Sequence, residues 1–135
     1  MRNRLAAALL IILLLAGCSA PEPPAVDVSG TWSGTGTFMP TGETAPVTLE
    51  LEQEGALVSG FLTLDGADGE QPAAPLTGTV AGRRLSLRFS LDTETLRGRG
   101  TLSGLINGDE YRSRGQVRVP GIWRPLDVRL VARRH

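Results

Sequence analysis

The stretch Arg84-Leu85-Ser86-Leu87-Arg88-Phe89-Ser90-Leu91 decides the fold of this chain. Large apolar residues alternate with arginine or serine, which is the period of a β-strand with one buried and one solvated face. The same period of two recurs in seven further segments, which are joined by turns rich in Gly, Pro, Asn and Asp. No segment after the first 17 residues has a sustained 3.6-residue apolar period. The sequence therefore predicts an all-β domain.

Eight antiparallel strands in sequence order close most simply as an up-and-down β-barrel, which also removes exposed sheet edges. A two-sheet β-sandwich is the alternative, because the number of strands does not separate the two folds. Many of the 17 glycines fall on the predicted inner face, where they let strands bend and approach closely. The last strand is expected to run from Ile122 to about Ala132, with Leu126, Val128 and Leu130 inward.

The first 18 residues have a different character. A basic start, Met1–Arg4, precedes the 11 apolar residues Leu5–Leu15, which are too few to cross a bilayer as a helix. Leu15-Ala16-Gly17-Cys18 follows and contains the only cysteine. This order resembles the lipobox signal peptide of bacterial lipoproteins. The resemblance implies a diacylglyceryl group on the Cys18 thiol and cleavage of the peptide bond before it.

These features divide the chain into three predicted parts. Residues 1–17 form a signal peptide, residues 18–28 the lipidated cysteine with a proline-rich linker, and residues 29–135 the barrel domain. Three prolines between Ser19 and Val28 suit an extended tether. The lipoprotein resemblance, with Ser19 after the cysteine, implies the inner leaflet of the outer membrane, facing the periplasm, if the host is Gram-negative.

Charged residues are divided unevenly along the chain. Residues 18–82 contain nine acids and no arginine, whereas residues 83–135 contain 12 arginines and five acids. The favoured interpretation is that acidic and basic strands pair within one sheet. The other is a basic surface that binds an anionic partner. The near-neutral total gives no case for nucleic acid binding. The candidate partner surface comprises Arg97, Arg99, Arg112, Arg114 and Arg118, with exposed Trp123 and Tyr111 adding aromatic contacts.

Gly30-Thr31-Trp32 opens the first predicted strand. It resembles the Gly-x-Trp signature of lipocalins and related calycin barrels, which include avidins and bacterial metalloprotease inhibitors. The resemblance implies that Gly30 and Trp32 close one end of the barrel and that an arginine of the last strand packs across the tryptophan. Arg129 is the candidate, although strand alternation places it outward unless a bulge at Pro125 reverses the face.

The sequence offers little for catalysis. The only histidine is His135, so Ser-His-Asp chemistry has no internal histidine to use. Asp65, Asp68 and Glu70 could face a Ca²⁺ ion, but they lack the full spacing of a calcium loop, which favours a solvated acidic loop. We therefore expect no enzymatic activity, no metal and no cofactor.

Three functions remain. The first is a non-catalytic binding module, held at the membrane through Cys18, for a lipid, a small apolar ligand or an envelope protein. The second is an accessory role in an envelope complex that docks through the arginine-rich strands. The third, inhibition of a periplasmic hydrolase, is less favoured, because the calycin inhibitors use a free N-terminal segment and a lipid on Cys18 would pin that segment.

Overall fold

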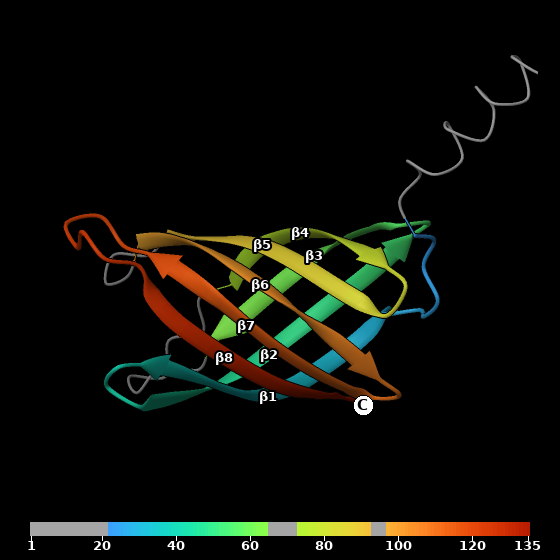
Figure 1. Ribbon diagram of the computed structural model, residues 1–135, viewed down its shortest axis with the longest axis horizontal. Coiled ribbons are helices and arrows are strands. Elements are labelled where there is room, and N and C mark those ends of the chain that lie inside the picture. Colours follow the sequence, from blue (N-terminus) through green and yellow to red (C-terminus); the bar gives the residue numbers. More distant parts are fainter. Residues whose placement is uncertain (1–21, 65–72, 93–96) are drawn as a thin grey trace, which may run out of the picture.

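Eight strands form one closed antiparallel barrel in the computed structural model, which describes residues 22–64, 73–92 and 97–135 (Figure 1). Each strand pairs with its sequence neighbours, and the last pairs with the first. The up-and-down barrel is confirmed, the sandwich is wrong, and the architecture is consistent with a lipocalin-like fold. The strands are β1 (Gly30–Met39), β2 (Glu43–Glu54), β3 (Leu57–Leu64), β4 (Ala73–Ala81), β5 (Arg84–Asp92), β6 (Arg97–Asn107), β7 (Glu110–Arg118) and β8 (Leu126–Arg134).

The predicted alternation places the apolar side chains inside the barrel. Leu85, Leu87 and Phe89 of β5 are buried, whereas the arginines between and beside them are exposed. Buried side chains from all eight strands form a single core cluster. The cavity that remains in this core has a volume of about 30 Å³ and only apolar lining, which is about the space of one water molecule. The lumen is therefore a packed core.

Close contact between tilted strands explains how the core is filled. From Gly30 on β1, the directly paired residue on each following strand can be traced round the barrel as far as Leu126 on β8. On β8, Leu126 is one position past Asp127, the partner of Met39 at the end of β1. One circuit thus shifts the register by about ten residues, which tilts the strands steeply. A Cβ on Gly100 would lie 2.2 Å from Cζ of Phe89, so this glycine makes room for the aromatic ring.

The last strand begins and ends later than predicted. It starts at Leu126 instead of Ile122, and it continues to Arg134 instead of ending near Ala132. Residues 119–125 form the β7–β8 loop, in which Ile122 and Trp123 are exposed. The two additional residues place Arg134 opposite Trp32 in the sheet.

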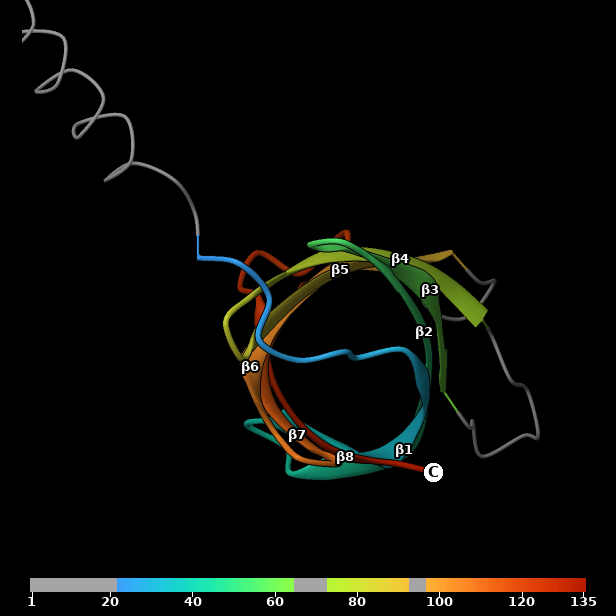
Figure 2. The ribbon, with the colours of Figure 1, turned by 90° about the vertical axis from the view of Figure 1, so that its right-hand side faces the viewer.

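Residues 23–29 cross one end of the barrel, which we call the plugged end (Figure 2). The N–H of Ala25 donates to the carbonyl oxygen of Gly82 at 2.8 Å, and the N–H of Gly82 donates to that of Pro23 at 3.0 Å. Val28 is completely buried. The prediction of a linker up to residue 28 is therefore wrong from Pro23 onward, because these residues are docked on the barrel. Cys18 and the predicted signal peptide lie outside the described residues.

Candidate functional site

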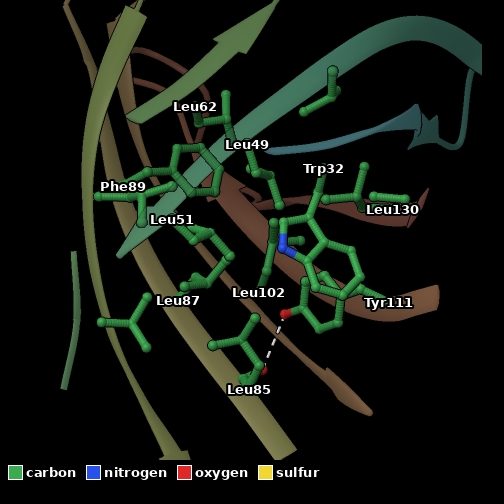
Figure 3. Packing of buried hydrophobic residues seen from close by; sticks show 14 of the residues in the cluster. Trp32, Leu49, Leu51, Leu62, Leu85, Leu87, Phe89, Leu102, Tyr111 and Leu130 are labelled. Carbon is green, nitrogen blue, oxygen red and sulfur yellow. Dashed lines mark hydrogen bonds between the residues drawn. The ribbon is translucent and has the colours of Figure 1, made fainter. Parts of the chain in front are cut away.

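Trp32 belongs to the core cluster and lies beside the segment that covers the plugged end (Figure 3). Its side chain is completely buried, and its indole Nε1 donates to the carbonyl oxygen of Val28 at 2.9 Å. The ring of Tyr111 meets it edge-on, with the ring centroids 6.5 Å apart and an angle of 72° between the planes. The tryptophan thus joins the docked N-terminal segment to the core.

The arginine that packs on Trp32 is Arg134, so the assignment of Arg129 is wrong. Cζ of Arg134 lies 4.8 Å from the centroid of the Trp32 ring. Its guanidinium donates to the carbonyl oxygen of Asp27 at 2.6 Å and to Oδ1 of Asp109 at 3.0 Å. Arg129 is exposed on the outer face, as the alternation indicated. The prediction failed because the expected strand ended before residue 134.

Replacement of Arg134 by methionine is expected to lower the free energy of unfolding by about 1–2 kcal/mol. The variant loses the cation–π contact with Trp32 and the hydrogen bonds that hold the docked segment. Arg129→Met is the matched control, because it removes an exposed arginine from the same strand, and its effect should stay within about 0.5 kcal/mol. Urea unfolding curves measure both variants. Equal losses would show that the Arg134 contacts contribute nothing specific.

Tyr111 is buried, so the prediction that it adds an exposed aromatic contact is wrong. Its hydroxyl donates to the carbonyl oxygen of Leu85 at 3.0 Å (Figure 3). Burial raises the pKa of Tyr111 well above its ordinary value of 10.0 and outweighs the opposing effects of Ser113 and Arg84. The phenol is therefore a neutral core residue at physiological pH.

The raised pKa predicts a loss of stability at alkaline pH. Above pH 10 the unfolded chain can ionise its phenol while the folded protein cannot, so stability should fall by up to about 1.4 kcal/mol per pH unit. The chain has no lysine and no other tyrosine, so few other groups titrate in this range. Tyr111→Phe should be less stable at pH 7 and lose less between pH 10 and 11.5. Parallel pH profiles of urea unfolding for the two proteins would contradict this assignment.

The outer sides of β5–β8 form a basic surface, which we call the arginine face. Because β6 and β7 are neighbours, the five arginines predicted for the partner surface do lie on one continuous sheet. The strand alternation that buries the core directs every one of these side chains outward. The exposed arginines of this face are Arg84, Arg88, Arg97, Arg99, Arg112, Arg114, Arg118, Arg129 and Arg133.

Two pairs of these arginines stand directly opposite each other on adjacent strands. Arg99 is opposite Arg118, and Arg114 is opposite Arg129. Like charges in this position destabilise a sheet. None of the four makes a salt bridge with another described residue. Fold stability does not account for this arrangement, and a bound anion would relieve it.

The acidic residues neutralise the arginine face only in part, because Arg97 pairs with Asp92 and Arg112 pairs with Glu110, each at 3.2 Å. Four exposed glutamates, Glu43, Glu50, Glu52 and Glu54, project from β2, while β1, β3 and β4 carry no charged residue. In an eight-stranded ring β2 lies across from β6, as Figure 2 shows. The ion pairs among the described residues all join partners from the second half of the chain, so the favoured interpretation of acidic strands pairing with basic strands is wrong there.

One corner of the arginine face borders an open groove of about 660 Å³ at the end opposite the plug. Arg97, Arg99 and Arg118 line it, and the β7–β8 loop adds Trp123. The Trp123 side chain is 84% exposed, as predicted, and Cζ of Arg124 lies 4.5 Å from its ring centroid. The structure thus gathers four of the seven predicted surface residues at one groove. Arg112 and Arg114 lie farther along β7, and Tyr111 is buried.

No catalytic or metal-binding arrangement stands out in the part of the chain that the structure describes. Nε2 of His135 lies 2.6 Å from Oγ of Ser33, but this contact is on the exposed outer surface. Within residues 22–64, 73–92 and 97–135, no group of three or more His, Cys, Asp and Glu could hold a metal ion. The acidic loop with Asp65, Asp68 and Glu70 lies outside these ranges.

No protein-family model matches the sequence, and no curated protein matches it significantly. Among the described residues there is also no helix with the length and hydropathy needed to cross a bilayer.

Proposed function

We propose that this protein is a lipid-anchored, non-catalytic docking module of the cell envelope that holds an anionic partner on its arginine face. The observation that carries the proposal is the set of exposed, unneutralised arginines on adjacent strands, above all Arg99, Arg114, Arg118 and Arg129. Guanidinium groups bind carboxylates and phosphates through paired hydrogen bonds. A rigid sheet presents these groups with little loss of backbone entropy on binding.

The packed lumen favours binding on the outside of the barrel. Sites for small molecules usually have volumes of about 300–1,000 Å³. The 30 Å³ cavity in the core is far below this range. A small apolar ligand inside the barrel is therefore not part of the proposal.

The docked N-terminal segment also argues against the inhibitor function. Residues 23–28 are engaged by backbone hydrogen bonds at Gly82 and by contacts with Gln53. A segment held in this way is not free to enter a protease cleft.

The membrane anchor is supported by the order of the basic start, the apolar run and Cys18. A single acyl chain binds a bilayer only marginally, whereas several chains on one residue hold it firmly. We expect the intact mass of the wild-type protein to include a diacylglyceryl group. Cys18→Ser, expressed behind a signal peptide whose cleavage does not require a lipidated cysteine, should lack this group and leave the membrane fraction. An unmodified wild-type mass would remove the anchor from the proposal.

Docking can be tested by cross-linking in cells of the native host, followed by purification of the full-length protein. Arg99→Glu/Arg118→Glu should reduce the recovery of cross-linked partners at least tenfold, because it places two carboxylates where an anion would bind. Thr77→Glu/Thr79→Glu is the control, since it adds the same two glutamates to exposed positions of the neutral strand β4. If both variants retain the same partners as the wild type, the arginine face is not the docking surface.

A further inference from the structure

The side of the barrel around β2 and β3 is complementary to the arginine face. We call the exposed residues Glu50, Glu52, Glu54, Leu57 and Phe61 the acidic face. Leu57 stands opposite Glu54, and Phe61 stands opposite Glu50. These two apolar side chains are 66% and 51% exposed. The acidic face therefore combines uncovered apolar side chains with carboxylates.

The arginine face has the same composition with the opposite charge. Leu105 is 50% exposed and lies between Arg84 on β5 and Arg112 on β7. Val131 is 43% exposed and stands opposite Arg112 on the other side. An apolar side chain flanked by arginines can meet an apolar side chain flanked by glutamates without burying an unpaired charge.

The geometry of the barrel lets two such faces meet between copies in the same orientation. Because β2 and β6 lie on opposite sides of the ring, a copy that is moved sideways without rotation brings its acidic face to the arginine face of its neighbour (Figure 2). A contact of this kind joins different surfaces of the two copies and can continue as a row.

A short anchor fits the same arrangement. The docked segment begins at Pro23, and the five residues from Cys18 to Pro23 can span at most about 18 Å. Copies that are attached through Cys18 would thus all have their plugged ends near the bilayer, with both charged faces pointing sideways. Confinement to a membrane raises the effective concentration and supports a contact that is weak in solution.

We propose that the anionic partner of the arginine face is a second copy of this chain, and that anchored copies associate side by side through the acidic face of one and the arginine face of the next. The inference rests on the proposed docking function and names its partner. It differs from binding to anionic lipid, in which the acidic face has no role.

Cysteine cross-linking tests the contact directly, because Cys18 is the only native cysteine and its thiol is consumed by the lipid. The exposed residues Ser59 on β3 and Ser103 on β6 mark the two faces. Full-length lipidated Ser59→Cys and Ser103→Cys proteins are mixed in phosphatidylcholine vesicles with a short bis-maleimide. We expect the mixed dimer to exceed both self-linked dimers at least fivefold and to decline at 0.5 M NaCl.

Complementary charge reversals give the decisive control. One protein carries Arg114→Glu/Arg118→Glu with Ser59→Cys and keeps its acidic face. The other carries Glu50→Arg/Glu52→Arg with Ser103→Cys and keeps its arginine face. This mixture should retain the cross-link, because the two faces that carry the cysteines keep their native charges. The cross-link should be abolished when either pair of reversals is instead placed on the protein whose cysteine marks the same face.

Two outcomes would overturn the inference. One is a mixed cross-link no stronger than the self-linked dimers. The other is arginine-dependent binding to phosphatidylglycerol vesicles without any mixed cross-link, which would identify a lipid headgroup as the anion. In both cases the proposed docking function would still stand if cross-linking in cells recovered partners from the wild type that Arg99→Glu/Arg118→Glu loses. The docking function itself would fail only if no such arginine-dependent partner were recovered.

Discussion

Replacement of Trp32 by alanine is expected to lower the free energy of unfolding by about 3–5 kcal/mol. The side chain is completely buried, so its removal opens a cavity at the plugged end. It also removes the edge contact with Tyr111, the ring beneath Arg134 and the hydrogen bond to Val28. Urea unfolding followed by far-ultraviolet circular dichroism measures the loss.

Trp123→Ala is the matched control, because the chain has only these two tryptophans. Trp123 is 84% exposed, and its removal should change the free energy of unfolding by no more than about 0.5 kcal/mol. The Trp123→Ala protein also retains Trp32 as the only indole, so its fluorescence reports the plugged end alone. Comparable losses in the two variants would contradict the role of Trp32 as the plug.

Replacement of Gly104 by alanine is expected to cost about 3 kcal/mol of stability through overpacking. A Cβ at this position would lie 1.8 Å from the carbonyl oxygen of Arg112 on the neighbouring strand. The obstacle is backbone, so no side chain can rotate away, and β6 must separate from β7. Urea unfolding measures the loss.

Gly36→Ala provides the comparison for this prediction. Gly36 is also a buried inward glycine, but its added Cβ would meet the end of the Val47 side chain at 3.2 Å. A methyl group can shift by a few tenths of an ångström, so the cost should remain below about 1 kcal/mol. If Gly36→Ala proved as costly as Gly104→Ala, close strand approach at Gly104 would not explain the effect.

The separation of roles between the inside and the outside of the barrel clarifies the proposed function. The inside is a packed core closed by Trp32, and it leaves no room for a ligand of ordinary size. The outside carries charges of opposite sign on opposite sides. A rigid barrel with this distribution is suited to docking, and the core supports that role by holding the strands in register.

Much of this structure was predictable because strand alternation is a local property. A residue's side of the sheet depends on its immediate neighbours in sequence, so the inward positions of Leu85, Leu87 and Phe89 and of Val128 and Leu130 were assigned correctly. The outward arginines of β6 and β7 followed from the same parity. Predicted turns between the segments then favoured sequential pairing, from which the closed barrel follows.

The remaining features depend on contacts between distant parts of the chain. Arg134 reaches Asp27 across 107 positions, and the docked segment meets the β4–β5 turn at Gly82. Which residues meet in such contacts depends on the register in which β8 pairs with β1 when the barrel closes. That register shifts if any strand gains or loses one residue.

The sequence by itself determined an all-β chain, the inner and outer faces of its strands, and five of the nine arginines of the arginine face. Only the tertiary structure decided that Arg134 and not Arg129 covers Trp32, that residues 23–28 are part of the domain, and that β2 lies across the barrel from β6. The physical reason is that a period of two fixes which way a side chain points, whereas closure of the ring fixes what it meets.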